Sequence, residues 1–388
     1  MDLSTKKIAI VGGGVAGLAS ALGLVQRGAE VTLYEQAPAI TEVGAGLQIS
    51  PNGHKVIADL GLTEALDAVS LPGLATQLFD HKARMVVQVD LPTSGYRYVH
   101  RAKLIEILEQ AYRGAGGSVQ TGLFVRHIDV RTGQLHFMDE LGDSLGTSPS
   151  YDFVLAATGL KSLARDQINQ GADPRFSKQV AWRAVIEETG QPTPEGAVYM
   201  GPGRHIVSYP LAAGLRNLVA VEARGTWTED GWSHQGDLDA FRAAFADFEG
   251  PVPGWLEAVK QVHCWGLFLR PVAQRWFEGR MALLGDAAHP TLPFLAQGAN
   301  LALEDAWMIR RALEHDPHYG EAFARFEAAR KPRVARVIKM AGQNARNFHF
   351  GWPLQGPAHA VLKAAHKLRP DALARRLAPI YDYDVTRF

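Results

Sequence analysis

Short uncharged runs and a helix-spaced apolar pattern follow one another at the start of the chain. Residues 6–11 have the length of a strand and become apolar after two lysines, residues 15–27 place apolar side chains at helical spacing, and residues 31–34 form a second apolar run. A strand, a helix and a strand in this order predict a βαβ unit, whose strands lie parallel in one sheet. Residues 8–25 carry no charge and reach the length of a membrane span, but their glycines favour a buried strand and helix.

Two later apolar runs are typical of further strands of the same sheet. Residues 151–157 and 281–284 are short, and each leads into small or acidic residues. In open parallel sheets the ligand lies beyond the carboxyl ends of the strands. We therefore expect both runs to end at one binding site.

The hydrophobic pattern changes in the middle of the chain. Apolar and polar residues alternate with a period of two, and Gly and Pro separate the segments, which predicts a separate antiparallel sheet. Its expected strands are residues 182–187, 197–200, 205–211, 217–222 and 263–269. After it, residues 299–314 and 321–344 have helical periodicity, and Pro353, Pro357, Pro370 and Pro379 punctuate a looser tail.

A glycine motif lies where the first predicted strand turns into the first helix. Gly12 permits a tight turn, Gly14 lets a pyrophosphate approach the backbone, and Gly17 lets the helix pack on the strand. Glu35 ends the second strand, about where an acid accepts hydrogen bonds from a ribose 2′-hydroxyl. The motif alone is weak evidence, but with Glu35 it predicts a dinucleotide site.

The second motif begins where the run 281–284 ends. Asp286, in the segment GDAAHP (285–290), follows that run, and Pro293, Gly298, Ala299 and Asn300 come where the next helix begins. An Asp at a strand end can bind a ribityl hydroxyl, which a flavin cofactor possesses. The helix N-terminus offers N–H groups and the positive end of its dipole to one edge of the flavin ring. This edge carries the negative charge of the reduced flavin. The two motifs together predict FAD, held noncovalently because no attachment signal stands out.

Charge and cysteine content narrow the classes of partner. The chain has 388 residues, and its 40 Lys and Arg balance 40 Asp and Glu, so the formal net charge is zero. No basic field is present to hold nucleic acid or an anionic membrane. The single cysteine, Cys264, cannot form an internal disulfide or a cysteine-rich metal site, and it suits a reducing compartment. We therefore expect a cytoplasmic protein without a metal, a nucleic-acid partner or a membrane partner.

At this point a family resemblance is visible. The sequence resembles the single-component, class A flavoprotein monooxygenases, in particular salicylate hydroxylase and the related hydroxybenzoate and hydroxynicotinate hydroxylases. The resemblance covers nearly the whole chain, and residues 285–306 are its most specific part. It rests on residues 12–19 (GGGVAGLA), Glu35, residues 42–53 (EVGAGLQISPNG), His100, Arg101, Leu104, residues 285–306 and residues 381–385 (YDYDV).

The resemblance implies further contacts with FAD. Arg101 would contact the phosphates or the ribose, for which a planar guanidinium is suited, and Val125 would contact the adenine through its main chain. Gly44, Ala45 and Gly46 are small enough for a backbone to lie against a flat ring. The remaining residues placed in the FAD site by the resemblance are Val15, Ala16, Gln36 and Leu47.

The resemblance also implies a substrate-facing strand over residues 205–210. His205 and Tyr209 are four residues apart, so on a strand both side chains point to the same face. In similar enzymes a histidine at this place helps to deprotonate a ring hydroxyl before the ring attacks a C4a-hydroperoxide of the flavin. A histidine is suited to this because its pKa lies near working pH. The alternative is that His205 is an ordinary residue of the sheet.

One departure from the family pattern concerns the reduction of FAD. Similar enzymes carry an Asp-Gly pair after the strand 151–157, whereas this chain has Thr158-Gly159, with Ser162 and Arg165 retained downstream. The missing Asp is associated with both the FAD pyrophosphate and NAD(P)H handling, so FAD binding is still expected, whereas the change puts reduction of the flavin by NAD(P)H in doubt. Two alternatives stay open: a flavin oxidase or dehydrogenase, and an FAD-binding protein that has lost turnover.

These observations predict an α/β protein with the fold of p-hydroxybenzoate hydroxylase. It would have a Rossmann-like FAD-binding domain, a mostly antiparallel sheet for the substrate, and a helical C-terminal region. The expected activity is hydroxylation of a small hydroxylated aromatic acid in aromatic-compound catabolism, with O₂ and NAD(P)H as transient co-substrate and a homodimer as the candidate assembly. The predicted boundaries are residues 1–72, 98–178 and 271–340 for the FAD domain, 73–97 and 179–270 for the substrate domain, and 341–388 for the C-terminal region.

Overall fold

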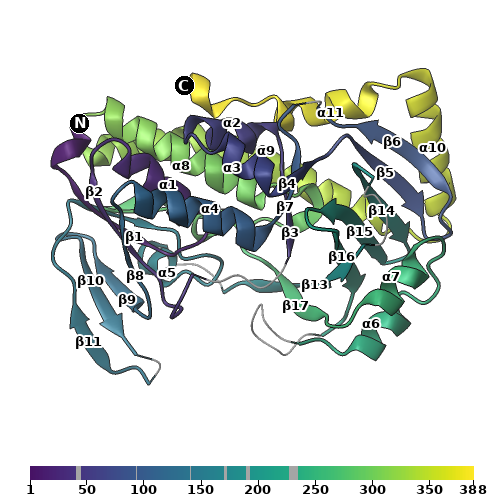
Figure 1. Ribbon diagram of the computed structural model, residues 1–388, viewed down its shortest axis with the longest axis horizontal. Coiled ribbons are helices and arrows are strands. Elements are labelled where there is room, and N and C mark those ends of the chain that lie inside the picture. The colour runs from purple at the N-terminus through teal and green to yellow at the C-terminus, as the bar shows by residue number, and fades with distance from the viewer. Residues whose placement is uncertain (41–44, 93, 140, 170–172, 189–192, 227–234) are drawn as a thin grey trace.

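A parallel sheet occupies one half of the molecule (Figure 1). The computed structural model describes residues 1–40, 45–92, 94–139, 141–169, 173–188, 193–226 and 235–388. The sheet has the order β18-β19-β12-β1-β2-β8, and every pairing is parallel except that of β18 with β19. Its strands are β1 (Lys7–Val11), β2 (Glu30–Tyr34), β8 (Ser118–Gln120), β12 (Phe153–Ala156), β18 (Phe277–Glu278) and β19 (Met281–Leu283).

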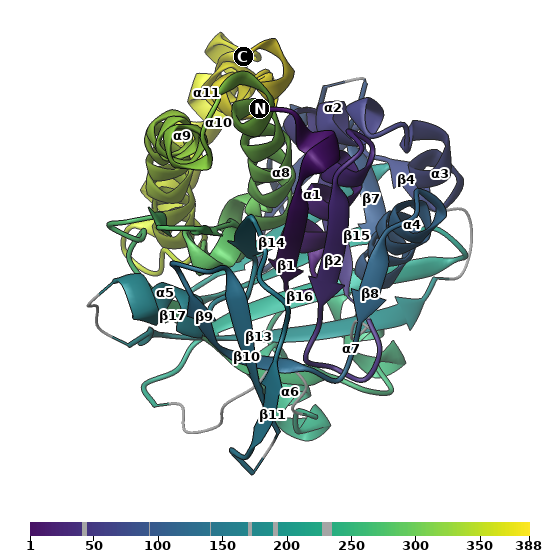
Figure 2. The same cartoon turned by 90° about the vertical axis from the view of Figure 1, so that its left-hand side faces the viewer.

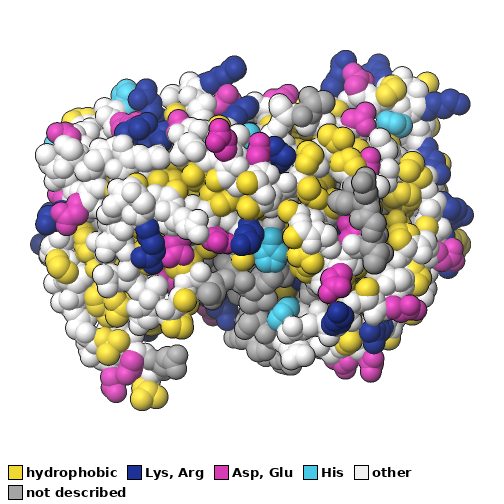
Figure 3. All heavy atoms as spheres, in the orientation of Figure 1, with side chains coloured by type: hydrophobic (Ala, Val, Ile, Leu, Met, Phe, Trp, Pro, Cys, Tyr) yellow, Lys and Arg dark blue, Asp and Glu magenta, His cyan; other side chains and the backbone are white. Residues whose placement is uncertain are grey.

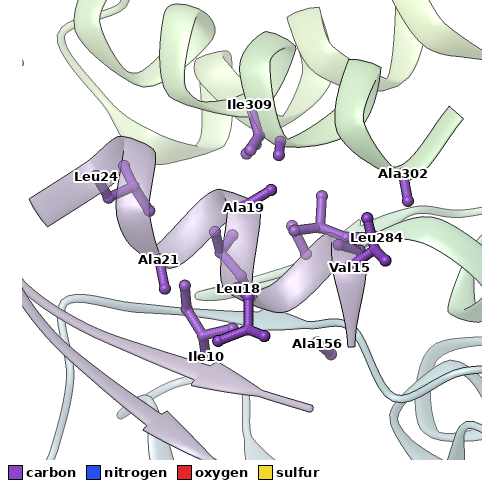
Figure 4. Close-up of a cluster of buried hydrophobic side chains, with 14 of the residues drawn as sticks. Ile10, Val15, Leu18, Ala19, Ala21, Leu24, Ala156, Leu284, Ala302 and Ile309 are labelled. Carbon is purple, nitrogen blue, oxygen red and sulfur yellow. The ribbon is translucent and has the colours of Figure 1, made fainter. Parts of the chain in front are cut away.

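Helices cover one face of this sheet, and a small antiparallel sheet covers the other (Figures 1 and 2). The helices are α1 (Val15–Val25), α4 (Arg101–Gly114), α8 (Gly298–His315) and α9 (Tyr319–Phe348), and the small sheet contains β9 (Phe124–Asp129), β10 (Gln134–Met138) and β11 (Ser144–Thr147). The helix α1 lies between β1 and α8 (Figure 4), where Leu18 points toward Ile10 and Ala19 toward Ile309. On the other face, the rings of Tyr34 and Phe137 lie 5.3 Å apart.

The second half is built on a seven-stranded sheet. Its order is β17-β13-β16-β15-β14-β5-β6, and its pairings are antiparallel except that of β14 with β5. The strands are β5 (Ala75–Asp80), β6 (Met85–Asp90), β13 (Arg175–Glu187), β14 (Glu195–Gly201), β15 (Arg204–Leu211), β16 (Leu215–Ala223) and β17 (His263–Leu269). The short helices α6 (Leu238–Ala244) and α7 (Val252–Ala258) cover its outer face, where Trp182 and Phe241 meet at 5.5 Å. Because side chains alternate along a strand, the neighbours of Trp182 point to the inner face.

The remaining elements join and cap the two halves. A three-stranded sheet orders β3 (Gly46–Ile49), β7 (Arg97–His100) and β4 (Ser70–Pro72). The connecting helices and turns are η1 (Leu3–Thr5), α2 (Pro51–Asp59), α3 (Thr63–Ala68), α5 (Leu163–Ile168), η2 (Gly285–Ala287) and η3 (Pro293–Leu295). The C-terminal helices α10 (Gln355–Leu368) and α11 (Ala372–Tyr381) lie beside β5 and β6, and η4 (Val385–Arg387) ends the chain (Figure 1).

The predicted fold class is confirmed, and the differences are local. The helix predicted over residues 15–27 ends at Val25, and the helix predicted over 321–344 runs from Tyr319 to Phe348. The tail is more regular than its prolines indicate, because α11 contains Pro379 near its end. Basic and acidic side chains are interspersed over the face that Figure 3 shows, as the balanced composition implies. Throughout the described ranges, every helix is too short or too polar to cross a membrane.

Candidate active site

A cavity of about 840 Å³ lies between the two halves. Its walls come from the carboxyl ends of the parallel strands, from the beginning of α8, and from the inner face of the seven-stranded sheet. Twelve of the residues predicted from the sequence line it: Gly14, Val15, Ala16, Gly46, Leu47, Arg101, His205, Tyr209, Asp286, Pro293, Gly298 and Ala299. Among the other residues predicted for the site, those outside this lining are Gly12, Gly17, Glu35, Gln36, Ala45, Val125 and Asn300.

The three glycines of the first turn fill different structural roles. Gly12 has a φ of 110°, and a side chain there would collide with the carbonyl group of Ala157. A side chain at Gly17 would collide with the carbonyl group of Gly12, so the helix can approach the strand only without one. At Gly14, by contrast, no atom other than those of its own chain neighbours lies within 4 Å of an added Cβ. The turn therefore leaves open space at the residue where the motif predicts a pyrophosphate, and this space belongs to the cavity.

Glu35 lies beside the glycine turn. Its carboxylate accepts hydrogen bonds from the N–H of Gly13 at 2.7 Å and of Ala37 at 2.9 Å. Each carboxylate oxygen can accept more than one bond, so Glu35 can still receive a ribose hydroxyl. The exposed Gln36 follows it, and the N–H of Leu123 donates to the carbonyl oxygen of Glu35, which brings the start of β9 and Val125 to the same end of the site.

Asp286 lies in the short helix η2 at the end of β19. It is deep in the protein, yet its side chain is exposed, because the space that it faces is the cavity. Burial raises the pKa of Asp286, the charges of His289 and Arg101 oppose this, and Asp305 adds to it. Hydrogen bonds donated by a ligand would stabilise the charged form of a carboxyl group in this position, so Asp286 favours a ligand with donor groups.

The beginning of α8 faces the same space. The N–H of Leu301 donates to the carbonyl oxygen of Gln297 at 2.8 Å, so the preceding N–H groups belong to the helix start, which lacks intrahelical acceptors. Gly298 and Ala299 line the cavity. The side chain of Asn300, however, is used within the protein: it accepts from the N–H of Ser50 and donates to the carbonyl oxygen of Gln48, each at 2.9 Å. Only the main chain of Asn300 is therefore left for a cofactor.

A buried charge network holds this motif in place. Asp305 accepts from the N–H of Gly285 at 2.9 Å and contacts Nε2 of His289 at 2.6 Å. Arg330 of α9 donates to Asp305 at 2.7 Å and to Glu304 at 2.5 Å. Arg333 and Asn52 complete the shell around Glu304, at 2.9 Å and 2.6 Å. The network thus fixes the turn that presents Asp286.

The strand β3 offers a flat surface next to these groups. An added Cβ at Gly46 would lie 2.7 Å from the Tyr209 ring and 2.8 Å from Asn217, so only glycine fits there. The N–H of Gly46 donates to Oδ1 of Asn217 at 2.7 Å, and the carbonyl oxygen of Ala45 accepts from the N–H of Arg101 at 2.8 Å. The prediction for Gly44 falls outside the described residues.

His205 and Tyr209 both lie on the inner face of β15 and line the cavity, so the predicted common face is correct. Tyr209 stacks on Tyr98 with 5.0 Å between ring centres. Burial raises the pKa of Tyr209 above its ordinary range, although Arg183 and a hydrogen bond with Asn217 oppose this. Tyr209 is therefore neutral at working pH and can donate a hydrogen bond.

His205 is fully enclosed apart from the cavity. Its ring centre lies 5.5 Å from that of Phe294 and 5.3 Å from that of Phe348. Nδ1 of His205 lies 2.7 Å from Nε2 of His349. Burial and the neighbouring His349 lower the pKa of His205 well below its ordinary value, so its ring is neutral at working pH. This protonation state is the one that a general base requires.

Two residues at this wall, one in its lining and one behind His205, had not been predicted. Arg183 of β13 lines the cavity, and its guanidinium carbon lies 4.8 Å from the centre of the Trp265 ring. The alternation of β13 could have placed Arg183 opposite the buried Trp182, but nothing in the pattern singled out its charge. His349 is 144 residues away from His205 and follows a helix, so no local spacing connects the two.

Thr158 lies at the edge of the site, between β12 and α5. Its hydroxyl group lies 2.5 Å from Oγ of Ser162, which caps α5 by accepting from the N–H of Arg165 at 3.0 Å. Burial lowers the pKa of Arg165 to about 10, Arg270 adds to this, and Asp166 opposes it. The hydroxyl group of Thr158 thus holds the loop between β12 and α5 in place, but it supplies no carboxylate. Its effect on reduction by NAD(P)H stays a prediction.

Comparison with known proteins now identifies the family. Residues 5–341 match the family model described as an FAD binding domain. The chain is 34% identical over 366 residues to 3-amino-4-hydroxybenzoate 2-monooxygenase PtmB3 of Streptomyces platensis, covering 89% of each chain. It is 30% identical to 6-hydroxynicotinate 3-monooxygenase of Pseudomonas fluorescens, covering 87% of this chain and 91% of the relative. The chain therefore belongs to the FAD-binding-domain family of flavoprotein hydroxylases.

Solved structures agree on the fold. A salicylate hydroxylase substrate complex superposes with a TM-score of 0.81 at 24% identity, covering 99% of this chain and 97% of the other. Klebsiella pneumoniae HpxO complexed with FAD and uric acid gives a TM-score of 0.80 at 24% identity, covering 94% of each chain. The family resemblance seen in the sequence is confirmed, and with it the enzyme class of monooxygenase and FAD as cofactor.

The residues present fit FAD, and Asp286 offers a direct test. Asp286→Ala is expected to weaken FAD binding by about 1–3 kcal/mol, the value of a hydrogen bond to a charged group. Titration of the apoprotein, followed by quenching of flavin fluorescence, measures this. Asp239→Ala is the matched control, because that side chain is 94% exposed on α6. Equal FAD affinities in the two variants would contradict the role given to Asp286.

Proposed function

We propose that the protein hydroxylates a small hydroxylated aromatic acid, with NAD(P)H and O₂ as co-substrates. The observation that carries this proposal is a single cavity. It joins the glycine turn, Asp286 and the start of α8 to a wall that bears His205, Tyr209 and Arg183. When FAD is bound and reduced, it supplies the activation of O₂ for insertion into the ring.

The wall provides the groups that prepare a phenolic ring. Nδ1 of His205 is engaged with His349, so Nε2 is the ring nitrogen left for a ligand. A neutral His205 can take the proton of a ring hydroxyl there, which makes the ring more nucleophilic. Tyr209 stays protonated and can donate a hydrogen bond to the resulting oxyanion. The surrounding aromatic rings of Phe294 and Phe348 keep water away from the reacting atoms.

Arg183 is the candidate group for the carboxylate of the substrate. Its guanidinium group lies in the cavity wall, and stacking on Trp265 restricts its orientation. A planar guanidinium can bind a carboxylate through two parallel hydrogen bonds. The names of the curated relatives, which include an aminohydroxybenzoate and a hydroxynicotinate monooxygenase, support an acidic ring as the substrate.

Arg183→Met is expected to raise the KM for the aromatic acid by about 10- to 100-fold, because a charge-assisted hydrogen bond of about 1.5–3 kcal/mol is lost. The corresponding carboxamide is the matched ligand control, since it lacks the negative charge. The measurement is steady-state NAD(P)H oxidation with both ligands, in the wild type, Arg183→Met and Arg183→Lys. If the acid and the amide lose affinity equally in Arg183→Met, Arg183 does not bind the carboxylate.

A substrate panel tests the proposed function itself. Hydroxybenzoates, aminohydroxybenzoates and hydroxynicotinates are each added with FAD and either NADH or NADPH, and the products are analysed by mass under ¹⁸O₂. We expect at least one compound to stimulate NAD(P)H oxidation and to gain one labelled oxygen atom. Hydrogen peroxide alone, in an amount equal to the cofactor oxidised, would favour an oxidase. The absence of any stimulation would favour a binding protein with impaired reduction, for which Thr158 is the candidate cause.

A further inference from the structure

A pair of histidines connects the cavity with the outside of the fold. Nδ1 of His205 and Nε2 of His349 are 2.7 Å apart, and the amide of Gln179 lies 3.2 Å from Nδ1 of His349. His205 lines the cavity, whereas His349 is half-buried and lies outside the lining, at the end of α9. The other close neighbours of His205, Phe294 and Phe348, and the partner Gln179 carry no titratable group.

We propose that His349 is a positioning and proton-relay residue, through which the ring-hydroxyl proton taken by His205 leaves the closed site. The proposal rests on the proposed function, because it assumes a hydroxylated aromatic ligand in the cavity. It adds to that function a second histidine, a defined path and a direction for the proton.

The proton transfers along this path balance, and they leave no charge on the histidines of the cavity wall. The ring hydroxyl gives its proton to Nε2 of His205, the Nδ1 proton of His205 passes to Nε2 of His349, and the Nδ1 proton of His349 passes to water. Both histidines begin and end neutral, and the negative charge stays on the ligand oxygen. The amide of Gln179 can turn either its oxygen or its nitrogen toward His349, so it can accept from Nδ1 before the transfer and donate to it afterwards.

The electrostatic surroundings favour passing the proton on over storing it. Burial lowers the pKa of His349 to about 4. Burial and the neighbouring His349 likewise lower the pKa of His205. An imidazolium ion in either place would be a buried charge without a paired carboxylate among these neighbours, which is costly. An acceptor beyond His205 is therefore needed if the ligand is to stay ionised.

A chromophoric ligand makes the proton step visible without turnover. 4-Hydroxy-3-nitrobenzoate is mixed with the FAD-loaded enzyme in a stopped-flow instrument, at a pH below the pKa of the free phenol, and the phenolate absorbance is followed. We expect His349→Ala to form the phenolate about 10- to 100-fold more slowly, by analogy with the loss found when the partner that orients a metal-ligating histidine is removed. Added imidazole should restore the rate, because His349 is accessible from outside.

1-Methylimidazole is the matched control compound, since it fills the same space but has no N–H to pass on. Rescue by both compounds, or by neither, would make His349 a packing residue and overturn the relay. His349→Gln provides a second variant that keeps a polar partner for His205, and a wild-type rate in it would also overturn the relay. A wild type that ionises the nitrobenzoate normally but forms no oxygenated product from any aromatic acid would refute the proposed function and leave the relay standing.

Discussion

Arg330→Met is expected to lower the free energy of unfolding by about 3–5 kcal/mol, the cost of removing one partner from a buried ion pair. Arg330 is fully buried and is bonded to both Glu304 and Asp305, which are also fully buried. Methionine keeps much of the length of the side chain but removes the positive charge that lies beside the two buried carboxylates. Urea unfolding of the apoprotein, followed by circular dichroism, measures the difference. Arg336→Met, at an exposed position of the same helix, is the matched control.

The pH dependence of this difference provides a second check. Burial alone would raise the pKa values of Glu304 and Asp305, but Arg330 with Arg333 and His289 more than offset it, so that both pKa values are lowered. Lowered carboxyl pKa values stabilise the folded state above the ordinary carboxyl range, and this stabilisation is lost as the pH falls through the folded values. The wild type should therefore exceed Arg330→Met most at neutral pH and least in acid. A difference that does not change with pH would show that lost packing, and not charge, is the cause.

The sequence predicted the parts of the site that depend on backbone geometry. The constraints on Gly12, Gly14 and Gly17 are local ones that a short motif can express. A side chain at Gly12 would meet the adjoining strand, one at Gly17 would meet the same turn, and Gly14 borders the open space. Asp286 was found for a similar reason, since a strand end is visible in the apolar pattern. The inner face of β15 followed from the period of two, which placed His205 and Tyr209 together.

The network behind the motif could not be predicted in the same way. Arg330 and Arg333 have the spacing of an ordinary solvated helix face, and their partners Glu304 and Asp305 lie on another helix. Only the packing of α9 on α8 turns these four charges inward. The same reason explains Asn300: its place in the motif suggested a cofactor contact, whereas its side chain holds β3 and the start of α2. The small sheet β9–β11 also escaped prediction, because its outer strands β9 and β11 are largely exposed and lack a clear apolar pattern.

His205→Gln is expected to lower the rate of hydroxylation by roughly 10²–10⁴-fold, the usual cost of losing a general base. Glutamine retains a polar side chain on β15 but cannot take a proton from the ligand. A ring that is not ionised is a poorer nucleophile, so NAD(P)H oxidation should continue with release of hydrogen peroxide. The measurement is the ratio of oxygenated product to NAD(P)H consumed. FAD content should not change, because His205 is not among the residues predicted to hold FAD.

A control variant and the pH dependence of the wild type make this prediction specific. His127→Gln is the matched control, since His127 is exposed on β9 and is absent from the cavity lining. The lowered pKa of His205 means that its ring is neutral over the range in which an ordinary histidine titrates. The coupling ratio of the wild type should therefore stay constant as the pH falls through about 6.5 and decrease only in stronger acid. A wild-type coupling ratio in His205→Gln would leave His205 as a structural residue of the sheet, and Tyr209 would then be the first candidate for activating the substrate.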